Sequence, residues 1–180
     1  MDYHIRLNKK EVYFPKNTFF GKAIIQIEQE EKMLRIGPNL FPFNNPYKIK
    51  FEFDEEDSLR LRQTFIAKKS DQKLFFLPTT FKGGNLETKL MDMGKFTLGR
   101  DSIPPKIVPS NFKANQWLSN FKFLKVQISD DFSGIKSYNG SINGEWVLFE
   151  YEPKKGLLTY DFSDKTFELS INISAPTGFD

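Results

Sequence analysis

The sequence contains no cysteine and only one histidine, His4, in 180 residues. Without cysteine the chain has no disulfide, no thiolate metal ligand and no thiol nucleophile. A zinc site would have to surround His4 with several carboxylates, so we expect this histidine at the surface or at a strand end. No Gly-x-Ser-x-Gly elbow accompanies it, which argues against a serine hydrolase. The sequence therefore predicts no catalytic residue, no metal ligand and no cofactor.

The chain also lacks a block of charge of one sign. Its 26 basic and 23 acidic residues are interspersed and give a net charge of +3, so we expect no nucleic-acid partner. The basic pairs Lys9, Lys10 and Lys68, Lys69 are predicted at solvated or edge-protecting strand ends.

Long apolar runs are absent as well. No stretch of about 18 apolar residues occurs, which predicts no membrane insertion, and the N-terminal residues lack the pattern of a secretory signal. The lack of cysteine fits either a reducing cytoplasm or a bacterial envelope protein without disulfides.

Helical periodicity is scarce, and alternation of apolar and polar residues is frequent. The best helix candidate is residues 54–63, where acidic residues come first and basic residues last, as the helix dipole favours. Period-two patterns over residues 23–28, 47–53 and 121–128 predict strands, and many phenylalanines suit the interior of a β-sandwich. We therefore predict an all-β protein.

Turn signals punctuate the strands. Asn143 and Gly144 predict a type I′ turn in a hairpin between residues 138–142 and 145–151. The doublet Gly83, Gly84 lacks the residues of a phosphate loop and is predicted to be a turn.

A rigid segment, Ile103-Pro-Pro-Lys106, is predicted to join two domains, because each proline fixes its φ angle and removes a backbone donor. We place a β-sandwich domain at residues 1–99 and a second one at residues 100–180. The strand, turn and strand pattern of residues 128–151 suggests that the second sandwich is immunoglobulin-like.

Acidic residues offer two alternatives to a purely structural reading. The run at residues 54–57 could serve a hydrolase, but neighbouring residues of a strand face opposite ways, and a helix N-terminus or solvated loop explains the run more simply. Asp101, Asp130, Asp131 and Asp164 could together bind calcium. Asp130, Ser133 and Gly134 are also turn formers, and we predict no metal site.

The tryptophans Trp117 and Trp146 could stack against a glycan. Large aromatic residues usually supply burial, so we expect core or half-buried positions for both, and for Tyr138 and Tyr160.

Several ordered motifs carry a resemblance to a known family. They are GKFTLGRDSIPPKI (94–107), SDDFSGIKSY (129–138), INGEW (142–146), EYEPK (150–154) and LTYDFSD (158–164), with FPKNTFF (14–20) before them. These segments resemble the non-catalytic C-terminal β-sandwich region that follows the peptidase domain in some lysostaphin-type zinc endopeptidases of Gram-negative envelopes. The resemblance spans residues 12–168 and is strongest over 94–164.

The resemblance implies a non-catalytic accessory module of a cell-envelope peptidoglycan metalloendopeptidase, located in the periplasm or cell envelope. Such a module would position the peptidase domain of the parent chain, or bind peptidoglycan or an envelope protein. The family's zinc ligands, a His and Asp pair with a later His-x-His, are missing here, so the chain itself is predicted not to be an enzyme. The family's last strand and its acidic-Asn-x-Gly-Asn turn are also missing from residues 168–180, which predicts an incomplete last strand. Two alternatives remain, a carbohydrate-binding or adhesion module and a hydrolase built from the acidic cluster.

Overall fold

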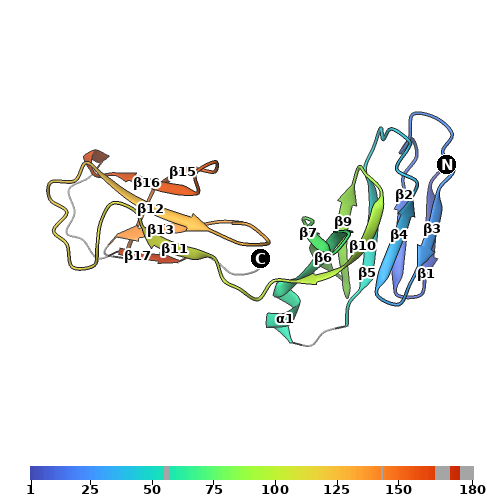
Figure 1. Cartoon of the computed structure of the whole chain (residues 1–180), viewed down its shortest axis with the longest axis horizontal. Helices are drawn as coiled ribbons and strands as arrows, with labels where there is room; N and C mark the ends of the chain where they lie inside the picture. Colours follow the sequence, from blue (N-terminus) through green and yellow to red (C-terminus); the bar gives the residue numbers. More distant parts are fainter. Residues whose placement is uncertain (55–56, 143, 165–170, 175–180) are drawn as a thin grey trace. The chain divides into compact units, whose positions relative to one another are not determined.

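The computed structural model describes residues 1–54, 57–142, 144–164 and 171–174. Over these residues the chain is almost entirely β-structure, arranged in antiparallel sheets (Figure 1). It divides into two compact units, Met1–Ser102 and a second that begins at Ile103. The division falls after Ser102, three residues beyond the boundary predicted after residue 99. The predicted all-β sandwich class is confirmed.

Two five-stranded sheets form the first unit. The spatial order of one is β1 (Tyr3–Leu7), β2 (Lys10–Phe14), β5 (Tyr47–Glu52), β9 (Asn85–Leu90) and β8 (Thr80–Lys82). That of the other is β3 (Gln26–Gln29), β4 (Met33–Gly37), β10 (Gly94–Arg100), β6 (Thr64–Ser70) and β7 (Lys73–Phe76).

Alternation along the strands explains the core of this unit. In β5 the side chains of Tyr47, Ile49 and Phe51 are buried, and the lysines between them are only partly buried. The buried residues pack with Leu34 and Phe96 of the other sheet in one hydrophobic cluster. Apolar burial between the two faces therefore stabilises a sandwich.

One short helix, α1 (Ser58–Gln63), precedes β6. The carboxylate of Asp57 caps it by accepting hydrogen bonds from the backbone N–H groups of Leu59 and Arg60, at 2.9 and 3.5 Å. The helix predicted for residues 54–63 therefore starts only at Ser58, and Asp57 at the end of the acidic run lies at its N-terminus, as predicted for the run. Glu55 and Glu56 lie outside the described residues.

Gly83 and Gly84 form the turn between β8 and β9. Both have positive φ angles, 56° and 75°, which a two-residue hairpin turn requires and which glycine adopts without steric cost. The predicted turn is confirmed.

Lys10 corrects a prediction. The sequence predicts a solvated or edge-protecting lysine, yet Lys10 is only 4% exposed. Its ammonium group donates hydrogen bonds to the carbonyl oxygens of Glu30 and Glu31, at 3.1 and 3.0 Å, and lies 5.6 Å from the centre of the Phe51 ring. Burial lowers the pKa of Lys10, and the Glu31 carboxylate opposes this shift. Lys10 faces inward because alternation along β2 places it on the same face as the buried Val12 and Phe14, and it joins the β3–β4 turn to the opposite sheet.

Among the described residues, the second unit has a four-stranded and a three-stranded sheet. The first has the order β11 (Lys106–Pro109), β12 (Phe123–Ser129), β16 (Leu157–Asp161) and β15 (Glu150–Glu152), and the second β14 (Glu145–Val147), β13 (Asn139–Ile142) and β17 (Ile171–Ser174). A short 3-10 helix, η1 (Phe162–Asp164), follows β16. Leu124, Val126 and Leu158 of one sheet pack with Ile142 and Val147 of the other.

The predicted hairpin at residues 138–151 is confirmed in its first half and wrong in its second. β13 and β14 pair with Ile142 opposite Glu145, while Asn143 lies outside the described residues. The continuous strand predicted for residues 145–151 breaks after Val147, and β15 pairs with β16 in the opposite sheet. The chain crosses between the sheets at Leu148 and Phe149, which places the Phe149 ring in the core.

β17 pairs along β13, with Asn139 opposite Ser174. The prediction of an incomplete last strand concerns residues 168–180, of which the structure describes only β17; residues 168–170 and 175–180 lie outside the described residues, so the prediction stays untested.

Candidate binding surface

The only histidine lies on the outer face of the first sheet. His4 of β1 pairs with Glu11 of β2, with 3.1 Å between His4 Nε2 and a Glu11 carboxylate oxygen, and its side chain is 55% exposed. The predicted surface position is therefore confirmed. The same carboxylate accepts hydrogen bonds from Arg6, the shortest of 2.5 Å, so His4 belongs to an ion-pair network.

That network continues across the sheet. Lys50 of β5 lies between two glutamates, 3.8 Å from Glu11 and 3.1 Å from Glu87 of β9, and Lys48 lies 3.2 Å from Glu87. The strand register places Glu11 beside Lys50 and Lys50 beside Glu87. Cross-strand pairs of opposite charge stabilise a sheet.

The surroundings of the two glutamates in this network favour their ionised forms. The hydrogen bond from Arg6 lowers the pKa of Glu11, and His4 adds to this shift while burial opposes it. Burial also disfavours ionisation of Glu87, but hydrogen bonds from Lys50 and Lys48 lower its pKa overall. A general acid needs a carboxyl with a raised pKa. Both glutamates are held in the ionised form instead.

Two of the four aspartates considered for calcium, Asp130 and Asp131, have other partners, and the side chain of Asp164 lies outside the described part of the structure. Asp130 accepts hydrogen bonds from the backbone N–H groups of Phe132 and Gly134, at 2.9 and 2.7 Å, as predicted for a turn former. Asp131 forms an ion pair with Lys106 at 3.1 Å. Within the described parts of the chain, no three His, Cys, Asp or Glu side chains are grouped to hold a metal ion.

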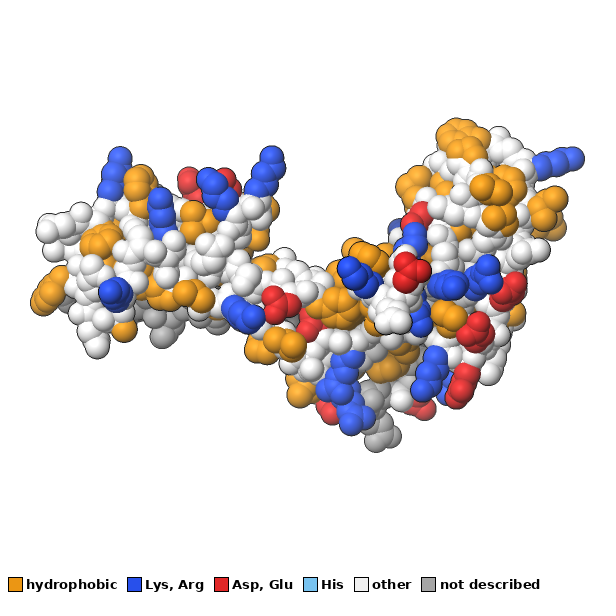
Figure 2. Space-filling model, in the orientation of Figure 1, with side chains coloured by type: hydrophobic (Ala, Val, Ile, Leu, Met, Phe, Trp, Pro, Cys, Tyr) orange, Lys and Arg blue, Asp and Glu red, His pale blue; other side chains and the backbone are white. Residues whose placement is uncertain are grey.

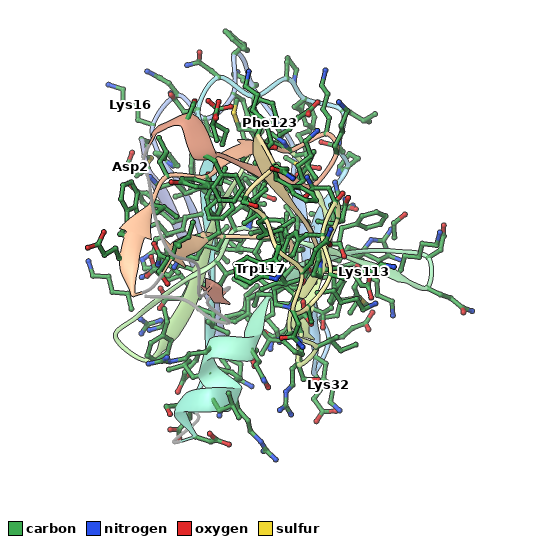
Figure 3. The ribbon with its side chains drawn as sticks, turned by 90° about the vertical axis from the view of Figure 1, so that its left-hand side faces the viewer. Asp2, Lys16, Lys32, Lys113, Trp117 and Phe123 are labelled. Atoms are coloured by element: carbon green, nitrogen blue, oxygen red, sulfur yellow. The ribbon has the colours of Figure 1, made fainter. Side chains whose placement is uncertain are left out.

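The tyrosines follow the prediction, and the tryptophans do not. Tyr160 is buried, and half-buried Tyr138 donates a hydrogen bond to the carbonyl oxygen of Phe149 at 3.0 Å. Trp117 is 90% exposed and Trp146 is 65% exposed, so the burial expected for both is wrong. Trp146 faces outward from β14, while Trp117 lies in the loop between β11 and β12 (Figure 3).

The base of this Trp117 loop, residues 110–122, is bonded to β12 in the second unit. The side-chain amide of Asn111 donates a hydrogen bond to the Phe123 carbonyl oxygen and accepts one from the Lys125 N–H, both at 2.8 Å. Phe112 and Leu118, on either side of Trp117, pack against the core. The loop therefore presents Trp117 to solvent while its neighbours anchor it.

Hydrogen bonds within the loop fix the turn before Trp117. The Gln116 side chain accepts from the Lys113 N–H at 2.9 Å, and the Gln116 N–H donates to the Lys113 carbonyl oxygen at 3.3 Å. The loop contains Lys113 and Lys122 and no acidic residue. Two lysines are too few to form a block of like charge, so no signal in the sequence marked this segment as a binding surface.

The first unit carries a separate apolar surface at one end. Phe20, Ile24 and Leu40 are strongly exposed on the loops that flank β3 and β4, and hydrophobic side chains gather there in Figure 2. The loops are joined by hydrogen bonds from the side chains of Asn44 and Asn45 to the Asn17 carbonyl oxygen, both at 3.1 Å.

No protein-family model, curated protein or solved structure matches this chain. Among the described residues, no helix has the length and apolar character needed to cross a bilayer.

Proposed function

We propose that this chain is a non-catalytic accessory module of a cell-envelope peptidoglycan metalloendopeptidase. In this proposal the two sandwiches are a scaffold that positions the peptidase domain or holds the cell wall or an envelope partner. The observation that carries the binding role is the anchored loop that keeps Trp117 in solvent. An exposed aromatic residue on a rigid scaffold is a typical recognition element.

The strand order supports an immunoglobulin-like second unit in this proposal. An immunoglobulin domain has strands A, B, E and D in one sheet and strands C and F side by side in the other. Taken in chain order, strands β11 to β17 correspond to A, B, C, C′, D, E and F. The order β11-β12-β16-β15 is then A-B-E-D, and the order β14-β13-β17 is C′-C-F. Because this architecture hosts many functions, the fold agrees with an accessory module without specifying its ligand.

A carbohydrate-binding or adhesion module unrelated to a peptidase is the second candidate. The exposure of Trp117 favours it as much as it favours a wall-binding accessory module. The two candidates differ in the ligand range, because an adhesion module would bind glycans other than peptidoglycan.

The test is a co-sedimentation of the purified chain with insoluble peptidoglycan, alongside a zinc-dependent wall-lysis assay on the same sample. We expect binding without lysis. Binding to unrelated insoluble polysaccharides with equal strength would favour the second candidate. Lysis that a chelator abolishes would contradict a non-catalytic role.

A further inference from the structure

We infer that Trp117 is a stacking platform for a sugar ring of the wall glycan, an inference that rests on the proposed function and names its binding site. Most of the surface of the Trp117 side chain is exposed to solvent. Burial of so large an apolar ring would normally stabilise a fold, and here that stabilisation is not used. The loop gains nothing for its own packing from the Trp117 side chain, since Phe112 and Leu118 supply the contacts with the core.

The surroundings of Trp117 fit a sugar better than a protein. Protein interfaces bury several apolar residues around a central anchor. The residues near Trp117 in the sequence of the loop are exposed and mostly polar, among them Lys113, Asn115 and Asn120. A sugar ring has an apolar C–H face that can cover an aromatic ring and a rim of hydroxyl and amide groups that can bond to polar neighbours.

The charge of the loop fits a glycan that bears carboxylates. Lys113 lies on the same loop as Trp117 (Figure 3), and residues 110–122 contain no acidic side chain that would repel an anion. The muramic acid and stem peptides of peptidoglycan supply carboxylates beside N-acetylated sugar rings. Because the Asn111 amide already fixes the base of the loop, less conformational entropy should be lost there on binding.

The chain offers a direct readout because it has only two tryptophans. Trp146→Phe leaves Trp117 as the single indole, and this variant is titrated with soluble glycan strands released from peptidoglycan and with chitotetraose. We expect a saturable change in Trp117 emission with both, and tighter binding of the anionic strands at low salt. No emission change with either probe would overturn the assignment.

Matched variants complete the test. Trp117→Ala should reduce co-sedimentation with protease-treated peptidoglycan by about tenfold or more, whereas Trp146→Ala should leave it within about twofold. Equal binding by both variants would reject Trp117 as the site while the proposed function stood. No binding by the unmodified chain would reject both the Trp117 site and the wall-binding form of the proposed function, and would leave only its positioning role. A Trp117→Ala effect that disappears once wall proteins are digested would assign the loop to a protein partner and overturn the inference.

Discussion

The ring of Phe149 lies directly against the backbone of Gly140. A Cβ atom on Gly140 would lie 2.3 Å from Cδ2 of Phe149, which is shorter than any tolerable contact. Phe149 is buried where the chain crosses between the sheets of the second unit, and its ring centre is 5.6 Å from that of Tyr160. Only a residue without a side chain fits at position 140 of β13.

Gly140→Ala should therefore destabilise the second unit by about 1–3 kcal/mol, because the added methyl group forces the Phe149 ring or β13 to move. Urea unfolding followed by circular dichroism measures this change. Gly21→Ala is the control, since no atom lies within 4 Å of the position a Cβ would take there. Equal midpoints for the two variants would show that β13 accommodates the methyl group.

Glu11→Gln should weaken the first unit at neutral pH by up to about 1 kcal/mol, since it removes the shared partner of Arg6, His4 and Lys50. The pKa of Glu11 is lowered in the folded state, chiefly by the Arg6 hydrogen bond. The folded state therefore binds this proton less readily than the unfolded state. The stability that ionised Glu11 adds is present above the ordinary glutamate pKa and is lost as the pH falls through its folded-state pKa.

Thermal unfolding at a series of acidic pH values tests this. The Tm difference between the parent chain and Glu11→Gln should shrink as the pH falls. Glu28→Gln is the control, because the ion pair of Glu28 with Arg35 is exposed and longer, at 3.4 Å. If the Tm difference stayed constant down to acidic pH, the charge of Glu11 would not contribute to stability, and only the packing of its side chain would.

Asn111→Ala should cost about 1–2 kcal/mol, because it leaves the Lys125 N–H and the Phe123 carbonyl oxygen without their side-chain partner. The Trp117 loop should also become more accessible to trypsin at Lys113. Limited proteolysis with mass spectrometry of the fragments measures this accessibility. Asn120→Ala, in the same loop, serves as the comparison, and equal cleavage of the two variants would contradict the role of Asn111.

Each unit should fold through its own core. Ile49 belongs to the core of the first unit and Leu124 to that of the second, and both are completely buried. Ile49→Ala and Leu124→Ala should each cost about 2–5 kcal/mol. A fragment of residues 1–102 should unfold cooperatively and lose the same free energy from Ile49→Ala as the whole chain does. A fragment without a cooperative transition would show that the first unit needs the rest of the chain.

Strands with alternating apolar and polar residues were predictable from the sequence. Segments with apolar residues on both faces were not. In β5 each apolar residue is followed by a charged one, so the pattern identifies the buried face. Residues 145–151 place large apolar side chains at both parities, Trp146 and Leu148 against Val147 and Phe149. Periodicity could not reveal that this segment crosses between sheets, because the break depends on the partner strand.

The candidate site was harder to predict because it depends on tertiary contacts. Burial is the usual role of tryptophan, and nothing in the residue type marks Trp117 as the exception. Its exposure follows from the anchoring of Phe112, Leu118 and Asn111 against β12 and the core. Likewise, the burial of Lys10 depends on carbonyl oxygens from a turn far along the chain.

The reactivity of the buried Lys10 amine can report transient opening of the first unit. An amine-reactive reagent can acylate Lys10 only in molecules whose β3–β4 turn has moved away from the opposite sheet, whereas the adjacent Lys9 is always accessible. The ratio of the two acylation rates gives the fraction of time that the first sandwich spends open. The two neighbouring lysines thus allow local opening of the sandwich to be measured without an engineered label.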